Sequence, residues 1–130
     1  NISRTKCLEE DLVVTEWPET GEVPPRCPRC GRMLRPDVVW FGEMLPEPAI
    51  EAAFDASRKC DLFFSIGTSA VVHPAASLPI EARRHGATVV EINPDETPVS
   101  EWAKFILRGP SGQILPLLVS GAWPPDQKAQ

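Results

Sequence analysis

Two cysteines three positions apart, Cys27 and Cys30, have the spacing of a metal-binding turn. A Cys-x-x-Cys turn presents two thiolates together, and zinc takes four such ligands in a tetrahedron. Cys7 lies 20 residues before Cys27 and can supply a third thiolate from a facing strand. The pattern predicts a structural zinc site with Cys7, Cys27 and Cys30 among its ligands.

The sequence leaves the fourth ligand of this site open. A four-cysteine site would have another cysteine at position 10, where this chain has Glu10. The Glu10 carboxylate can bind zinc, a water can take its place, or the site is weakened or empty. Cys7 is then either a ligand or an ordinary thiol. Cys60 is far from the other cysteines, and we expect it to be a small core residue or a helix-boundary residue.

The composition restricts the compartment and the class of protein. A length of 130 residues with 42% hydrophobic side chains fits one globular domain. The net charge of −5 argues against a general nucleic-acid binder. No apolar run reaches the roughly 18 residues that span a bilayer, so no membrane segment is expected. Four cysteines without a recognisable secretory signal favour a metal site in a reducing cytoplasm.

A basic cluster surrounds the cysteine pair. It has two interpretations: a solvated face beside metal thiolates, or a patch that binds phosphate. The cluster consists of Arg26, Arg29, Arg32 and Arg35.

The first 36 residues have little periodicity. Val13–Thr15 predicts a brief strand, and prolines and glycines surround it. Such a segment cannot bury enough apolar surface alone, so we expect residues 1–36 to form a small zinc-ribbon module held by its metal.

Apolar runs alternate with helical patterns over residues 37–121. The run at 61–67 is almost continuously apolar, which is typical of a strand buried on both faces. The alternation predicts an α/β fold with a partial Rossmann-like parallel sheet, followed by a flexible tail at 122–130. Predicted strands lie at 38–41, 61–67, 88–92 and 104–107, and predicted helices at 49–59, 74–85 and 114–119.

Two loops follow predicted buried strands of this sheet. Ligands of parallel sheets bind at the carboxyl ends of strands, where Gly67-Thr68-Ser69 and Asn93-Pro94-Asp95 would lie. Glycine permits close approach of the backbone, and hydroxyls and amides can hold phosphate or ribose oxygens. The same residues also suit a tight turn, and Asn93 can simply cap its own turn. His85 is expected to cap a helix, and His73 receives no catalytic role.

Taken together, these residues resemble the C-terminal half of a sirtuin, the family of NAD-dependent protein-lysine deacylases. The resemblance extends from residue 1 to about 119. The motif at residues 34–43 is similar to that of the family's bacterial branch and of the branch that removes acidic acyl groups. The opening residues resemble the stretch just after the family's catalytic His-Gly, so we expect the chain to be a piece of a longer protein. The matching motifs are Cys27–Gly31, Leu34–Glu43, Gly67–Ser69 before Pro74, Glu91–Pro94 and Gly109–Pro110.

The resemblance implies roles for individual residues. Zinc would be bound by Cys7, Cys27 and Cys30, remote from the chemistry. NAD would contact Gly67, Thr68, Ser69, Asn93, Pro94, Asp95 and Ser111. One wall of the acyl-lysine channel, where the substrate peptide adds as a strand, would consist of Val39, Trp40, Phe41, Gly42 and Glu43. Plain core packing is the other interpretation of Trp40 and Phe41.

The resemblance also implies what this chain does not contain. In the family the acyl group is transferred to ADP-ribose, nicotinamide is released, and a histidine base activates a ribose hydroxyl. That histidine is expected just before Asn1, and a glycine-rich NAD loop further upstream. We therefore expect this chain alone to be inactive, poorly stable or prone to aggregate, and the full-length protein to be a monomer acting on acylated-lysine proteins or peptides.

Two other hypotheses remain. A non-catalytic module with a zinc ribbon would bind NAD or ADP-ribose as a stably folded chain. A zinc-ribbon adaptor for nucleic acid or protein would use the basic cluster, and its binding would be sensitive to salt.

Overall fold

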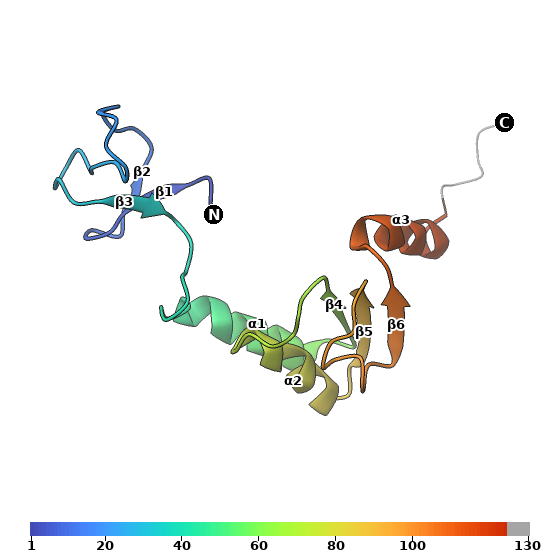
Figure 1. Cartoon of the computed structure of the whole chain (residues 1–130). Coiled ribbons are helices and arrows are strands. Elements are labelled where there is room, and N and C mark those ends of the chain that lie inside the picture. Colours follow the sequence, from blue (N-terminus) through green and yellow to red (C-terminus); the bar gives the residue numbers. More distant parts are fainter. Residues whose placement is uncertain (125–130) are drawn as a thin grey trace. The chain divides into compact units, whose positions relative to one another are not determined.

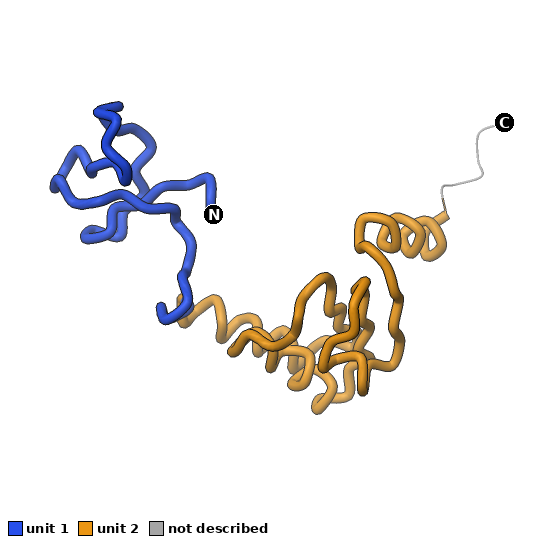
Figure 2. Tube along the Cα trace, in the orientation of Figure 1, with its two compact units in different colours: residues 1–45 blue, residues 46–130 orange. Residues whose placement is uncertain are grey.

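The computed structural model describes residues 1–124, which form two compact units divided between Leu45 and Pro46 (Figure 2). The predicted flexible tail at 122–130 falls largely outside the described residues. The division between the units lies nine positions beyond the boundary after residue 36 that the sequence suggested.

The first unit is a small antiparallel sheet. Strand β1 (Thr5–Cys7) lies between β2 (Val13–Val14) and β3 (Leu34–Pro36), and Cys7 pairs with Leu34. Its buried centre holds just Cys7, Cys27 and Leu34, with Val14 and Trp17 packed against them. So few apolar side chains provide little stabilisation, which agrees with a module held by a metal.

The strand predicted at 38–41 is wrong. The strand in this region is β3, and residues 38–41 form bends and a turn that leave Trp40 53% and Phe41 92% exposed. The apolar run has strand propensity but no neighbouring strand in the described residues. Strand propensity depends on such a partner, and β3 gains one because it pairs with β1.

The second unit is the predicted α/β sheet (Figure 1). Strands β4 (Leu62–Ile66), β5 (Thr88–Asn93) and β6 (Phe105–Arg108) are parallel, in the order β4-β5-β6. Helix α1 (Glu47–Lys59) packs against α2 (Leu78–Arg84), which packs against β4 and β5. The short helix η1 (Ala75–Ser77) precedes α2, and α3 (Ser111–Ala122) follows β6. Every strand and helix predicted after residue 48 is therefore present, with shifted ends.

The ends of the helices follow from local residues. Pro46 and Pro48 stand at the start of α1, where a missing N–H costs nothing. Cys60 caps the end of α1, as predicted for a boundary residue. His85 caps α2, and Gly86 follows with φ +94°, a conformation that favours glycine.

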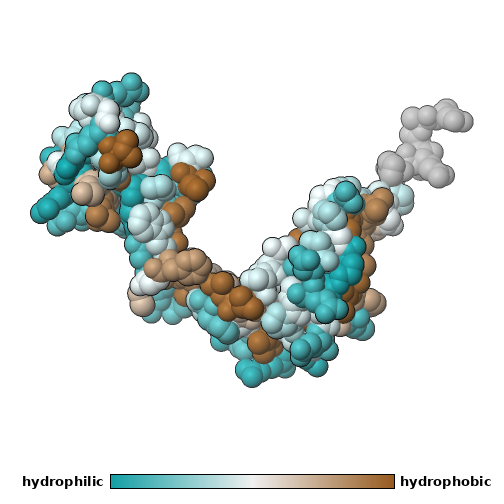
Figure 3. All heavy atoms as spheres, viewed as in Figure 1, coloured by the Kyte–Doolittle hydropathy of each residue, from teal (hydrophilic) through white to brown (hydrophobic). Residues whose placement is uncertain are grey.

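Burial differs between the strands. All of β5 except the half-buried Thr88 is buried, as expected for a strand inside a parallel sheet. The prediction that the β4 run is buried on both faces is wrong, because Leu62, Phe64 and Ile66 are 48%, 43% and 37% exposed. Helix α2 packs against β4 and β5 and α3 against β5, and these contacts leave the three β4 side chains partly exposed. Figure 3 shows hydrophobic residues reaching the surface of both units.

Among the described residues, no helix has the length and apolar character needed to cross a bilayer.

Candidate metal centre and nucleotide-binding loops

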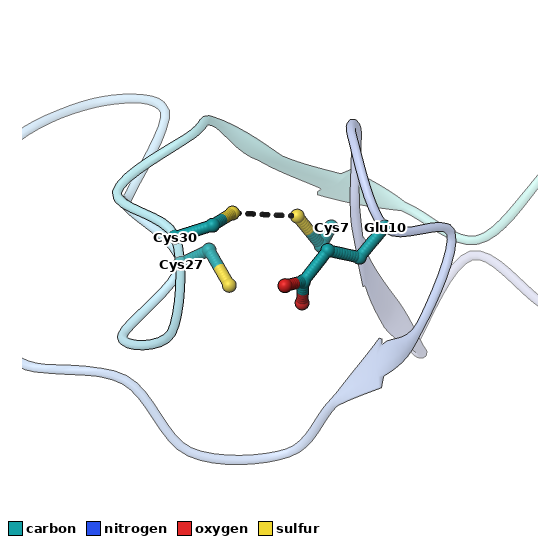
Figure 4. A group of neighbouring side chains, drawn as sticks. All are labelled: Cys7, Glu10, Cys27 and Cys30. Carbon is teal, nitrogen blue, oxygen red and sulfur yellow. Dashed lines mark hydrogen bonds between the residues drawn. The ribbon is translucent and has the colours of Figure 1, made fainter.

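Four side chains of the first unit converge on one point (Figure 4). Ligand atoms of Cys7, Glu10, Cys27 and Cys30 all lie within 4.8 Å of one another. The Cys7 and Cys30 sulfurs are 3.4 Å apart, and all three thiols are free. Three sulfurs and one carboxylate oxygen at such spacing form a donor set that fits a tetrahedral zinc ion. The structure thus brings together the three predicted cysteines and Glu10.

Short backbone hydrogen bonds shape this cluster. The Cys27 carbonyl accepts the Gly31 N–H at 2.9 Å, and the Cys27 N–H donates to the Arg32 carbonyl at 2.7 Å. Gly31 has φ +73°, which a residue with a side chain rarely adopts. On the other side, the Cys7 N–H donates to the Leu12 carbonyl at 2.9 Å. Two tight turns therefore present the ligands to each other.

The thiols are electrostatically coupled. The backbone N–H groups of Cys30 and Arg29 hold the pKa of Cys27 below its usual value. The Arg32 N–H lowers the pKa of Cys30, but desolvation and the neighbouring Cys7 and Cys27 sulfurs outweigh it and raise that pKa to about 11. Zinc ligands are bound deprotonated, so a divalent cation would favour the thiolate form of all three cysteines.

The basic cluster is mostly neutralised by acids. Arg26 pairs with Glu22 at 2.6 Å, Arg29 with Glu10 at 3.5 Å, and Arg35 with Glu43 at 2.7 Å. Three of the four arginines therefore have carboxylate partners. This arrangement favours the solvated, paired face over a phosphate patch.

Three loops of the second unit meet at the carboxyl ends of β4, β5 and β6. The Gly67 N–H donates to the Ile92 carbonyl at 2.9 Å, and the Asn93 side-chain amide donates to the Thr68 carbonyl at 2.8 Å. The Gly109 N–H donates to the Asn93 carbonyl at 3.3 Å. Asn93 is thus the buried link between all three loops. It also accepts the Asp95 N–H, so both its capping and its bridging roles are real.

The predicted NAD residues follow these strands. Gly67, Thr68 and Ser69 are exposed, as are Pro94 and Asp95, so their backbone and side chains can be reached by a ligand. Ser111 is half-buried at the first position of α3, two residues after Gly109. The crevice at the carboxyl ends of parallel strands is where such sheets bind nucleotides.

A buried acid supports the middle loop, and the sequence analysis missed its role. Glu91 is 0% exposed, and its carboxylate accepts hydrogen bonds from Thr97 and Ser100 and from Arg108 at 3.0 Å. Arg108 also donates to the Asp95 carbonyl at 2.8 Å. Burial raises the pKa of Glu91, but the three hydrogen bonds outweigh it and hold that pKa below its usual value. An acid inside an apolar strand was the available signal, since buried charges are paired.

The predicted substrate wall lies in the first unit. Glu43 accepts the Trp40 N–H at 3.0 Å and pairs with Arg35, whose guanidinium lies 4.9 Å from the Trp40 ring centre. These contacts close a turn at Gly42, which has φ +89°. Val39, Trp40 and Phe41 are exposed. Core packing therefore does not account for Trp40 and Phe41 within the residues that the structure describes.

The two histidines make hydrogen bonds to residues of helical segments. His73 Nδ1 lies 3.0 Å from the Ser77 hydroxyl, and His85 Nδ1 lies 3.0 Å from the Glu81 carbonyl. Among the described residues, neither histidine hydrogen-bonds to Asn93 or Thr68.

Comparison with known protein families shows which family has this cysteine cluster and these loops. The model of the Sir2 family matches residues 1–74, more than half of the chain. The chain belongs to the Sir2 family. This confirms the resemblance drawn from the motifs, and the match includes both the cysteine cluster and the Gly67–Ser69 loop.

Individual Sir2 relatives agree with this assignment. A protein of Methylococcus capsulatus named NAD-dependent protein deacylase is 53% identical over 108 residues, which cover 82% of this chain and 42% of that protein. The crystal structure of a Sir2 homolog–NAD complex superposes with a TM-score of 0.83 at 40% identity, over 92% of this chain and 47% of that one. A Sir2 structure bound to a propionylated peptide gives the same TM-score at 28% identity, over 92% and 52%.

The chain spans about half or less of the length of the curated Sir2 relatives it matches. The α/β fold and the family are thereby established. The activity of the whole protein does not follow from the family alone and depends on what the loops at the carboxyl ends of β4, β5 and β6 can bind.

Proposed function

We propose that this chain carries the zinc module and the C-terminal part of the nucleotide-binding domain of an NAD-dependent protein-lysine deacylase. The observation that carries the proposal is the meeting of three loops at the carboxyl ends of β4, β5 and β6, joined through Asn93. The Sir2 homolog–NAD complex and the deacylase name of the Methylococcus relative support it.

In this proposal the loops hold the dinucleotide. The exposed backbone of Gly67, Thr68 and Ser69 approaches the phosphates and ribose, since φ +61° at Gly67 turns the chain sharply after β4. Asn93, Pro94 and Asp95 form the neighbouring side of the crevice, and Ser111 lies towards the adenine. NAD supplies the electrophilic ribose carbon that takes the acyl group as nicotinamide leaves.

The acyl-lysine substrate would lie along Val39, Trp40, Phe41, Gly42 and Glu43. The turn is held by Glu43 and Arg35, which leaves the apolar side chains of Trp40 and Phe41 free to contact an acyl chain. The propionylated-peptide complex of a Sir2 relative supports an acylated peptide as the ligand class.

Deacylation in this family needs a histidine base, and neither histidine of this chain lies at the meeting point of the loops after β4, β5 and β6. The two histidines contact Ser77 and Glu81. We therefore propose that these 130 residues alone do not deacylate a peptide. The proposal further includes zinc bound by Cys7, Cys27 and Cys30, a reducing cytoplasm as the compartment, no specific nucleic acid, and a monomeric full-length protein.

A chimaera with the Methylococcus relative tests this function. The 108 matching residues of that deacylase are replaced by those of this chain, which are 53% identical. The chimaera should remove propionyl groups from a lysine peptide only when NAD is present, and Asn93→Ala should lower its apparent NAD affinity at least about 10-fold, from loss of a buried hydrogen bond. Glu51→Gln, an exposed change on α1, is the matched control.

Two results would contradict the proposal. A folded chimaera that binds no NAD would exclude the loops as a nucleotide site. NAD-dependent deacylation by the 130-residue chain alone would contradict its inactivity. A folded chimaera that binds NAD but stays inactive would favour the non-catalytic binding module.

A further inference from the structure

We infer that Glu10 is itself a metal ligand, so that this chain holds zinc in a Cys₃Glu centre with Arg29 as the partner that orients the carboxylate. The inference concerns the first unit alone and does not depend on nucleotide binding.

The position of the Glu10 carboxylate carries the inference. One of its oxygens, Oε2, is buried and has no hydrogen-bond partner in the structure. A buried carboxylate oxygen that accepts no hydrogen bond costs free energy, and the Arg29 guanidinium 3.5 Å away offsets only part of that cost. Because the ligand atoms of Cys7, Cys27 and Cys30 lie within 4.8 Å of the Glu10 carboxylate, a cation bound among them would remove that cost.

The Arg29 guanidinium lies beside the same Glu10 oxygen. Its Nε lies 3.5 Å from Glu10 Oε2, a distance long for a hydrogen bond but close enough to attract the carboxylate. Three thiolates and a carboxylate carry four negative charges against the two positive charges of zinc. The guanidinium reduces this excess, and outer-shell partners of this kind commonly fix the orientation of a ligand.

A water molecule explains the geometry less well than Glu10 does. A water ligand would occupy the fourth position while the Glu10 carboxylate, already among the sulfurs, stayed beside three thiolates with the Arg29 guanidinium as its counter-charge. Oxygen binds zinc at about 2.0–2.2 Å and sulfur at about 2.3 Å, so oxygen ligands can be told apart from sulfur ligands. The loss of affinity on changing Glu10 then separates its carboxylate from a water.

The test is X-ray absorption spectroscopy of the 130-residue chain loaded with one equivalent of zinc, together with zinc affinity by competition with a chelator. The wild type should give three sulfurs at about 2.3 Å and one oxygen at about 2.0–2.2 Å. Glu10→Cys should give four sulfurs. Glu10→Gln should lower zinc affinity at least about 10-fold, and Arg29→Ala should lower it by about 10-fold, the lower range for outer-shell changes.

Glu9→Gln is the matched control, because Glu9 is the exposed neighbour outside the cluster, and it should keep wild-type affinity. Unchanged affinity in Glu10→Gln would overturn the inference and identify water as the fourth ligand. Four light-atom ligands, two sulfurs, or no zinc binding by the wild type would also overturn it. If Glu10→Gln does not fold, the zinc affinity of Glu10→Ala decides in its place: it falls if the carboxylate is a ligand and is unchanged if water is. Zinc binding and ADP-ribose binding are measured separately, so failure of one leaves the other intact.

Discussion

The side-chain amide of Asn93 donates a hydrogen bond to the backbone carbonyl of Thr68 across 2.8 Å, although 25 residues separate them in the chain. This bond ties the loop after β4 to the loop after β5. Asn93 is buried while Thr68 is exposed, so the bond anchors an exposed stretch of backbone to a buried side chain. Both loops thereby become one surface at the end of the sheet.

Asn93→Asp should weaken nucleotide binding by the Methylococcus chimaera that carries this chain. Aspartate has the shape of asparagine and can still accept the Asp95 N–H, but it cannot donate to the Thr68 carbonyl. Loss of that bond and the added negative charge should lower ADP-ribose affinity about 10-fold or more, measured by calorimetry. Glu51→Gln should leave it unchanged. Equal affinity in Asn93→Asp would show that the bridge is not needed.

Glu91→Gln should destabilise the second unit. Glutamine keeps one acceptor oxygen but places an N–H₂ group against the Arg108 guanidinium, which leaves a buried donor without a partner. The free energy of unfolding should fall by about 1–3 kcal/mol in urea denaturation. Glu101→Gln, an exposed acid on the turn between β5 and β6, should change it by less than about 0.5 kcal/mol. Similar losses in both variants would contradict a special role for Glu91.

Acid should selectively remove the contribution of Glu91. Its hydrogen bonds hold its pKa in the folded chain below the unfolded value of about 4.3. Its stabilisation is therefore fully present above that value and is lost as the pH falls through the folded pKa. Urea midpoints of the wild type should drop more steeply below about pH 4.3 than those of Glu91→Gln. Parallel profiles for the two proteins would show that Glu91 is not ion-paired in solution.

Cys27→Ser should release the first unit and leave the second folded. The core of the first unit is made largely of the ligands themselves, so loss of a zinc thiolate removes much of what holds it together. Amide exchange of β1 and β3 should accelerate strongly while β5 stays protected. Cys60→Ser, at the end of α1, is the control and should change neither. Protection of β1 in zinc-free Cys27→Ser would mean that the unit folds without metal.

Phe64→Lys should reduce self-association of this chain. The register places Phe64 and Phe105 on either side of Val90, and the side chains of both phenylalanines are exposed. Exposed apolar sheet surface promotes association, and a charge on it opposes association. Light scattering should show smaller particles for Phe64→Lys, whereas Val71→Lys, outside the sheet, should behave as the wild type. Identical particle sizes would exclude this face as the contact.

The sheet of the second unit was predictable because its signals are local. The apolar runs at β4 and β5 and the prolines and glycine around α1 and α2 each specify an element without reference to distant residues. The strand predicted at 38–41 failed because strand formation requires a partner, and β1 pairs with Leu34–Pro36 instead. The exposed face of β4 could not be inferred from its own residues, since burial depends on what covers the sheet.

The candidate site was predictable in part. The cysteine spacing indicated the metal cluster, and the loops after β4 and β5 were expected together because parallel strands end at the same edge. The bond from Asn93 to Thr68 and the contact of Arg108 with Glu91 join residues 25 and 17 positions apart, and no pattern in the sequence relates them. Glu10 was left open because its ligand role depends on where its carboxylate lies.

The most direct test of the account is titration of the Methylococcus chimaera with ADP-ribose, followed by NMR at the backbone amides of this chain's residues. The account predicts saturable shifts concentrated at Gly67–Ser69, at Asn93, Asp95 and Ser111, and small changes in β1 and β3. Absence of saturable shifts in a folded chimaera, or shifts confined to the cysteine cluster, would contradict the assignment of these loops as the nucleotide site.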